Sequence, residues 1–312
     1  MLPASTIQYA PNSAGLNDIA RSIIRTLLYF RVFRYPIRRQ ELFNYVSSEN
    51  RIEVQSVLAH LISDELVKCE GDFIWVMDED GGIPNRLRGN ASAEKYLSVA
   101  KRHARMLSWF PFIKCICVSG SLSKYYMDSK SDIDYFIIAK KRRLWLTKLL
   151  MSLIVETLEL LRLEKYFCPN YIITENNLEI TDRNIFSAME IITLIPLYNQ
   201  DEYERFLAAN DWIREYFPVY GMNLAVDAVE YRPRLGRLWS AGVFTWFDSR
   251  VFSFYKKRFA RKVRKGKIKA VDNEMVITEN DFKLHLSGHR RRILQRLEHN
   301  IAEYEQRFGV EL

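Results

Sequence analysis

A polar segment between two apolar runs constrains the fold of this chain more than any other feature. The runs are residues 113–118 and 135–139, and the segment between them opens with Gly-Ser and closes with Asp-Ile-Asp. Both runs have the length and composition of buried strands. Because residues i and i+2 of a strand face the same side, a strand over 132–139 places Asp132 and Asp134 together. Two adjacent carboxylates repel each other unless a cation lies between them, so the pattern predicts a cation site at a sheet edge.

The residue types around this segment predict which ligands the site takes. Carboxylate oxygens at the spacing of Asp132 and Asp134 suit a Mg²⁺ ion that bridges nucleotide phosphates. Gly120 lets the backbone approach a phosphate closely, and the Ser121 hydroxyl can donate a hydrogen bond to it. The N–H groups that open a short following helix would point at the anion. Lys124 either contacts the triphosphate or is an ordinary solvated lysine.

The segment VSGSLSKYYMDSKSDIDYFII resembles the signature of the nucleotidyltransferase superfamily to which DNA polymerase β belongs. The shared pattern is a strand ending in Gly-Ser, a spacer, and then Asp-apolar-Asp-apolar. Ser131, which precedes the first aspartate, also matches, and the resemblance adds it to the nucleotide-binding residues. The resemblance covers residues 93–180. It implies Mg²⁺-dependent transfer of a nucleoside monophosphate from a nucleoside triphosphate to an acceptor hydroxyl, with Asp132 and Asp134 as catalytic metal ligands.

One expected part of the signature is missing. The superfamily places a third carboxylate on a later strand of the same sheet. The predicted strand YFCPNYIIT carries Cys168, Asn170 and Ile172 on one face, and Asn170 stands where the acid is expected. An amide ligates Mg²⁺ weakly and cannot act as a base. Glu175 at the strand end is an alternative metal ligand, or else a solvated loop residue.

The missing acid leaves a second function open. In that alternative the chain is a non-enzymatic nucleotide-binding or nucleic-acid-binding regulator with a degenerate nucleotidyltransferase fold. Two further segments, YFRVFRYPIRRQEL and CPNYIITENNLEITDRNIFSAMEIITLIPLY, resemble an uncharacterised bacterial branch of the same superfamily.

Residues 18–80 predict a winged helix-turn-helix. Helical periodicity begins after Asp18, which is expected near the N-cap, and two more helices are predicted over 38–46 and 51–64. Two β-like runs, LVKCE and DFIWVM, then flank Gly71-Asp72, an order that suits a type II′ hairpin turn. Winged helices bind DNA or dock proteins, and the sequence leaves both open.

The remaining segments complete an α+β prediction. Alternating helix and strand patterns over 91–180 indicate a small mixed-sheet nucleotidyltransferase domain. Residues 1–17 are expected to be a flexible tail, and 181–312 a helical C-terminal region. The helices expected there cover residues 182–195, 202–217, 238–265 and 280–307.

The charge of the chain favours anionic partners. The formal net charge is +8 and the sequence pI is about 9.2. Residues 256–269 hold nine Lys or Arg and no acid, on a predicted helix with an apolar stripe. This stretch is either a solvated basic face or an electrostatic track for nucleic acid. The candidate nucleic-acid-binding residues are Lys256, Lys257, Arg258, Arg261, Lys262, Arg264 and Lys265.

Cysteine usage and hydropathy predict a cytoplasmic protein. Its four cysteines form no C-x-x-C pair, which is typical of reduced thiols. The uncharged run 238–247 is far shorter than the roughly 20 residues that a membrane-spanning helix needs.

The resemblance to nucleotidyltransferases implies the expected partners. They are a nucleoside triphosphate, Mg²⁺ and an acceptor that is a small molecule, a protein or a nucleic acid.

Overall fold

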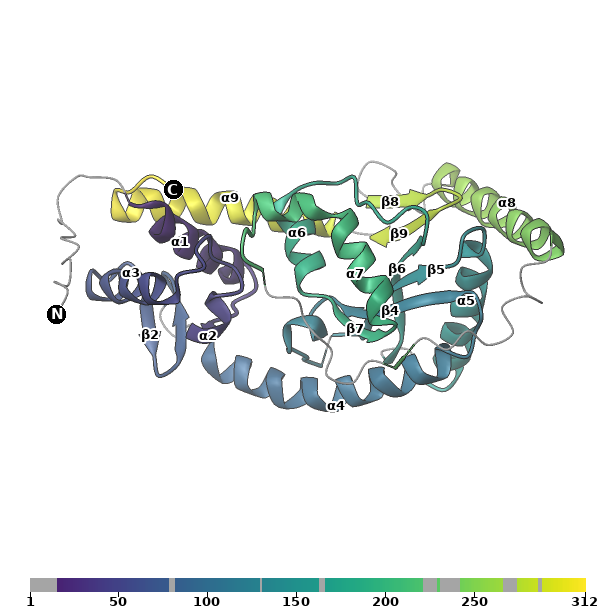
Figure 1. Ribbon diagram of the computed structural model, residues 1–312, viewed down its shortest axis with the longest axis horizontal. Coiled ribbons are helices and arrows are strands. Elements are labelled where there is room, and N and C mark those ends of the chain that lie inside the picture. The colour runs from purple at the N-terminus through teal and green to yellow at the C-terminus, as the bar shows by residue number, and fades with distance from the viewer. Residues whose placement is uncertain are drawn as a thin grey trace. The chain divides into compact units, whose positions relative to one another are not determined.

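The computed structural model describes residues 16–78, 82–129, 131–162, 166–220, 229–230, 242–265, 274–285 and 288–312. The chain has mixed α+β structure and forms two compact units (Figure 1). The N-terminal unit comprises Met1–Gly82 together with Gln295–Leu312, and the sheet unit comprises Ile83–Leu294. Helix α9 (His289–Phe308) contributes residues to both units. The predicted tail, residues 1–17, lies outside the described residues except for Leu16 and Asn17.

The N-terminal unit builds a small antiparallel sheet beside short helices. Its sheet has the strand order β1-β3-β2, and Gly71 between β2 and β3 has a φ of +59°, as a type II′ turn requires. The elements are α1 (Asp18–Arg31), β1 (Ile37–Arg38), α2 (Arg39–Leu42), α3 (Arg51–Ser63), β2 (Lys68–Glu70) and β3 (Phe73–Trp75).

The predicted start of the first helix agrees with the structure, whereas one predicted helix end in this unit was wrong. Asn17, the residue before Asp18, caps α1, because its extended backbone lets Oδ1 accept a hydrogen bond from the Ala20 N–H at 2.7 Å. Helix α2 ends at Leu42 rather than at residue 46. Val46 is nevertheless fully buried, since the turns that follow α2 point it into the core. The spacing of the buried residues Leu42 and Val46 therefore resembled that of a helix, although the chain leaves the helix after Leu42.

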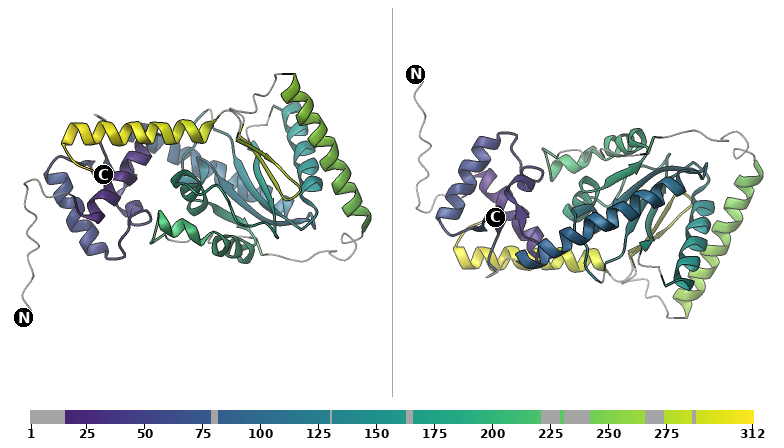
Figure 2. Two further views of the ribbon diagram at one scale, coloured as in Figure 1. Left: turned by 90° about the horizontal axis from the view of Figure 1, so that it is seen from above. Right: turned by 90° about the horizontal axis from the view of Figure 1, so that it is seen from below.

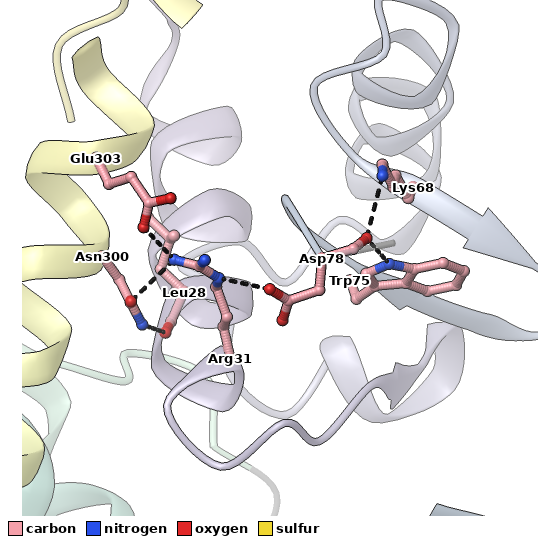
Figure 3. A network of polar contacts seen from close by, with 7 residues as sticks. All are labelled: Leu28, Arg31, Lys68, Trp75, Asp78, Asn300 and Glu303. Carbon is pink, nitrogen blue, oxygen red and sulfur yellow. Dashed lines mark hydrogen bonds and ion pairs between the residues drawn. The ribbon is translucent and has the colours of Figure 1, made fainter. Parts of the chain in front are cut away.

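Arg31 ties the C-terminal half of α9 to α1 (Figure 3). Its guanidinium donates to Glu303 at 2.7 Å and Asn300 at 2.9 Å, and it also reaches the Asp78 carboxylate at 3.2 Å. The Asn300 amide in turn donates to the Leu28 carbonyl. The Arg31 side chain is only 17% exposed, so these contacts are partly shielded from water. The network explains why residues from Gln295 onward belong to this unit.

The sheet unit is a six-stranded sheet with helices on both faces. Its strand elements are β4 (Ile113–Ser119), β5 (Asp134–Ala139), β6 (Cys168–Thr174), β7 (Ile195–Tyr198), β8 (Glu274–Ile277) and β9 (Asp281–His285). Its helical elements are α4 (Ile83–Leu107), η1 (Leu122–Lys124), α5 (Leu144–Leu160), α6 (Ile185–Ile192), α7 (Gln200–Ala209), η3 (Asp211–Glu215), α8 (Gly242–Arg264) and the start of α9.

The strand order is β7-β4-β5-β6-β9-β8, and β5–β6 is the parallel pair, joined by α5. Side chains alternate between the two faces of β5. Tyr135 contributes to the core that α4 and α5 cover, and its hydroxyl meets the ring of His103 on α4. Phe136 faces the other way and packs against Phe206 of α7 at a ring-centroid distance of 4.8 Å. Asp134 shares the α6–α7 face with Phe136.

Helix α4 starts much earlier than the predicted limit of residue 91. It begins at Ile83, because Pro84 is tolerated in a first helical turn. Gly89 lies within the helix, where a Cβ atom would stand 2.2 Å from the Tyr126 ring. Gly89 is therefore a packing site for Tyr126 within the helix.

The prediction that 181–312 is wholly helical was wrong. Strand β7 pairs with β4 at the sheet edge, where Pro196 is tolerated. Strand β9 lies where the start of the last helix was expected, and it forms a hairpin with β8, so that helix begins only at His289. The helix expected over 202–217 is divided at Asn210, whose buried side chain bonds Ile180 and Leu178. Residues 238–241 lie outside the described residues.

Candidate functional site

The two halves of the sequence signature meet at Gly120 and Asp134. Ser119, the last residue of β4, is the register partner of Asp134, the first residue of β5. Gly120 has a φ of +67°, and a Cβ atom on it would lie 2.3 Å from Oδ2 of Asp134. The residue must therefore be glycine both for its backbone conformation and because the carboxylate occupies the side-chain position. The Gly-Ser turn and the carboxylate form one site.

Asp134 is a half-buried carboxyl group in an environment that disfavours its charge. Removal from water raises its pKa to about 7, and the negative charges of Glu190 and Asp132 raise it as well. A hydrogen bond from the Cys168 thiol and the positive charge of Lys124 act in the opposite direction. The site thus holds more negative charge than its own cations balance, which is the condition under which a bound metal ion stabilises a protein.

Asp132 lies just outside the strand. The predicted strand over 132–139 begins only at Asp134, so Asp132 belongs to the preceding loop and is exposed. Ile133 between them is fully buried, which anchors the loop end to the core. Asp132 still raises the pKa of Asp134 through its charge, so the two carboxylates are neighbours.

The other predicted nucleotide-binding residues differ in whether their side chains are free to meet a ligand or already bonded within the protein. Ser121 is exposed at the turn, but Lys124 is folded back on the protein, where it bonds Glu190 at 2.7 Å and the Gly120 carbonyl at 3.2 Å. Ser131 donates to the Asp128 carboxylate at 2.8 Å and so closes its loop. The Lys124 and Ser131 side chains already have partners within the protein, so both would have to exchange a partner to reach a phosphate.

The two candidates for the missing ligand lie at opposite ends of β6. Asn170 sits at the irregularity where β6 shifts register against β5, and it lines a pocket with Ser119 and Glu190. Glu175 follows the far end of the strand, where it accepts from the Lys141 N–H and pairs with Lys114. Because β6 runs parallel to β5, Glu175 lies at the end of the strand away from Asp134, so of the two candidates only Asn170 is on the Asp134 side of the sheet.

Glu190 is the carboxylate that sequence reasoning missed. It projects from α6 and bonds Lys124, and its charge acts on Asp134. One signal was available, since Glu190 is the sole charged residue of α6, whose other residues are mostly apolar and buried. A single acid in such a helix is more often paired than solvated, so the sequence pattern indicates a cationic partner for Glu190.

The predicted basic helix packs through its apolar stripe. Phe252 and Tyr255 of α8 lie against Trp145 of α5 at ring-centroid distances of 5.0 and 5.6 Å, and α8 runs along α5 in both views of Figure 2. Its opposite face is exposed and makes no ion pair with the described residues. The exposed cations are Lys256, Lys257, Arg258, Arg261, Arg264 and Lys265. The Lys262 side chain lies outside the described part of the structure.

The chemistry of the donors at Asp132 and Asp134 fits magnesium, with ligands still to be added. In the described ranges no group of three or more His, Cys, Asp or Glu residues is placed to hold a metal. Nucleotide-site Mg²⁺ commonly uses one or two protein carboxylates and takes its remaining ligands from phosphates and water. A pair of carboxylates is therefore sufficient on the protein side.

Comparison with known proteins assigns no family to the chain. No protein-family model, no curated protein and no solved structure matches it. A search of the described helices for one long and apolar enough to cross a membrane found none.

Proposed function

We propose that the chain is a Mg²⁺-dependent nucleotidyltransferase that moves a nucleoside monophosphate group from a nucleoside triphosphate to an acceptor hydroxyl. The contact of Gly120 with the Asp134 carboxylate carries the proposal, because it joins the Gly-Ser turn to the acidic pair in one place. Because Gly120 has no side chain, the Asp134 carboxylate lies directly against the turn, and a metal ion held by that carboxylate would lie next to the turn that binds the phosphates.

The fold of each unit supports the same proposal. In the sheet unit, a strand ending in Ser119-Gly120 runs antiparallel to the strand that opens with Asp134, and a third strand, β6, lies parallel beside it. This arrangement is the one expected for a nucleotidyltransferase domain. In the N-terminal unit, the element order and the β1-β3-β2 sheet fit a winged helix. We assign both folds as part of the proposal.

Each residue of the site has a role in this reaction. Asp132 and Asp134 would hold Mg²⁺, which when bound stabilises the charge on the phosphates. Gly120 and Ser121 bind the phosphates, and the exposed Ser121 is accessible to a nucleotide from solvent. Glu190 takes the place of the third carboxylate, and it pairs with Lys124 in the nucleotide-free structure.

A binding measurement tests the proposal. Calorimetric titration of the four nucleoside triphosphates is expected to show that at least one of them binds in the presence of Mg²⁺. Removing the metal with EDTA should weaken that affinity at least about tenfold, since the triphosphate would then meet uncompensated carboxylates. Equal affinity with and without metal, or no binding of any triphosphate, would contradict the assignment.

A nucleic-acid acceptor is a second element of the proposal, and the exposed basic face of α8 supports it. The face also carries exposed aromatic residues, among them Trp246 and Phe254, on which unpaired bases can stack. Seven cations within ten residues, with no acid among them, give a local positive charge that a solvated helix does not need. We expect single-stranded RNA or DNA to bind along this face.

Salt dependence distinguishes this interface from a merely solvated helix. Replacing four cations by Gln removes four phosphate contacts, so the slope of log affinity against log salt should flatten by about 3. The substitutions are at Lys256, Lys257, Arg261 and Lys265. A control variant removes the same charge from the exposed surface of α4, at Lys95, Lys101, Arg102 and Arg105. Equal slopes for the two variants, or no binding at low salt, would return α8 to the solvated interpretation.

A further inference from the structure

A pocket opens on the sheet face that bears Asp134, beneath α6 and α7. It has a volume of about 60 Å³, and its wall includes Ser119, the register partner of Asp134, and Glu190. By the size of a water molecule the pocket has room for about four to six waters, which is space for one planar ring system. The pocket therefore adjoins the proposed phosphate and metal site.

Aromatic rings form the apolar wall of this pocket, and contacts hold them in place. Phe136 meets Tyr171 edge to face at 5.4 Å and packs on Phe206 at 4.8 Å. The Tyr171 hydroxyl donates to Asp281 at 3.3 Å, and the Lys283 ammonium lies over the Tyr171 ring. Rings fixed in this way provide flat apolar surfaces for another ring.

One buried polar group of the pocket, the Ser187 hydroxyl, has no hydrogen-bond partner among the described residues. Ser187 is only 5% exposed. The Asn170 side chain likewise makes no hydrogen bond to the described residues, yet it lines the same pocket. A buried hydroxyl without a partner destabilises the fold, and a ligand that bonds to it removes this cost.

This combination specifies the chemistry of the occupant. Flat apolar walls select a planar ring, and a hydroxyl with a carboxamide offers both donors and acceptors to its edge. A nucleobase has both properties. We propose that this pocket binds the base of the nucleotide, with the ring against Phe136 and Tyr171 and its polar edge toward Ser187 and Asn170. The inference rests on the proposed function, because that function supplies a nucleotide beside the pocket.

Nucleosides test the pocket without the metal site. Uridine, cytidine, adenosine and guanosine, titrated without metal and followed by ligand-observed NMR, are expected to show saturable binding of at least one of them. Ser187→Ala should weaken that binding about 5- to 30-fold, the worth of one or two kcal/mol of hydrogen bonding. The melting temperature should stay the same or rise, because the variant loses an unpaired buried hydroxyl.

Two controls separate the possible failures. Ser253→Ala removes an exposed hydroxyl on α8 and should bind nucleosides as the wild type does. Magnesium tripolyphosphate has no base, so its binding reports on the metal and phosphate site alone. Tripolyphosphate binding without saturable nucleoside binding overturns the pocket and leaves the proposed function standing. Nucleoside binding that Ser187→Ala leaves unchanged also overturns the pocket. Nucleoside binding in a wild-type protein that does not bind magnesium tripolyphosphate overturns the proposed function.

Discussion

Replacing Asp132 and Asp134 together by alanine is expected to abolish Mg²⁺-dependent nucleotide binding and to leave the nucleotide-free protein more stable. Binding should fall at least about 100-fold, since both protein ligands of the metal are lost. Stability should rise, because the variant removes a half-buried carboxylate and its repulsion with a neighbour. Opposite effects on binding and on stability are typical of a functional site.

The gain in stability should depend on pH in a defined direction. The pKa of Asp134 is raised to about 7 in the folded chain, whereas an unfolded aspartate ionises near pH 4. Between these values the folded state keeps a proton that the unfolded state has lost, so wild-type stability falls as the pH rises from 4 to 7. Asp134→Asn removes this loss. Its melting temperature should therefore exceed that of the wild type more at pH 8 than at pH 5.

A matched variant controls for the loss of two negative charges. Glu94 and Glu159 are exposed on α4 and α5, and their double alanine variant carries the same net charge as the aspartate variant. It should bind Mg²⁺-nucleotide normally and gain no stability at pH 8. Thermal melts and calorimetry on the four proteins provide the comparison. Undiminished Mg²⁺-nucleotide affinity in the aspartate variant would remove Asp132 and Asp134 from the proposed site.

Local sequence patterns predicted the central part of the sheet unit. Strands β4, β5 and β6 are apolar runs bounded by turn residues, and such runs are recognisable without tertiary information. The sequence pattern also placed the Gly-Ser turn and the acidic pair in one site, and the antiparallel pairing of β4 with β5 brings Gly120 next to Asp134. The pattern did not predict the exact start of β5. The strand begins two residues later than expected, so Asp132 lies in the preceding loop.

The missed elements are those whose structure depends on distant partners. Strand β7 has four residues, one of them Pro196, and becomes a strand because β4 offers an edge. In β9, Phe282 is buried while its neighbours Asp281 and Lys283 contact Tyr171 on the other face, an alternation too short to outweigh the helical pattern that follows. Short strands at sheet edges are set by pairing rather than by propensity.

The same physical reason explains the candidate site. Asp132, Asp134 and Gly120 lie close together in sequence, and the signature finds them. Glu190 reaches the site only because α6 packs over the sheet face that bears Asp134. Ser187 lies one helical turn earlier and lines the adjoining pocket. In the chain, α6 follows α5 and β6, which come after Asp134. No local spacing in the sequence therefore relates Ser187 or Glu190 to Asp134.

Exchanging the candidates for the third carboxylate decides between an enzyme and a regulator. Two metal ions offset charge on the entering and leaving oxygens of phosphoryl transfer, and they need more carboxylates than nucleotide binding does. If Glu190 supplies the extra carboxylate, Glu190→Gln should lower pyrophosphate release about 10- to 100-fold with nucleotide binding largely retained. Asn170→Asp adds an acid beside the same site, so it should raise turnover if position 170 faces the metal.

Glu175→Gln is the matched control for these two variants. It removes one negative charge from the end of β6 that lies away from Asp134, and the amide oxygen can still accept from the Lys141 N–H. Its turnover should equal that of the wild type. A panel of the four triphosphates with pyrophosphate detection, run on all four proteins, gives the comparison. Equal turnover in Glu190→Gln and the wild type would remove Glu190 from the chemistry.

Nucleotide binding without turnover would have a structural explanation in the same residues. Lys124 holds Glu190 at 2.7 Å, and Cys168 occupies the register position beside Asp134 on β6. A site that keeps this ion pair closed binds the triphosphate through Asp132 and Asp134 alone and offers no carboxylate to activate an attacking hydroxyl. Pyrophosphate release that is absent from the wild type and appears in Asn170→Asp would then identify the chain as a regulator that lost its third acid. Release by the wild type that Glu190→Gln abolishes identifies it as an enzyme.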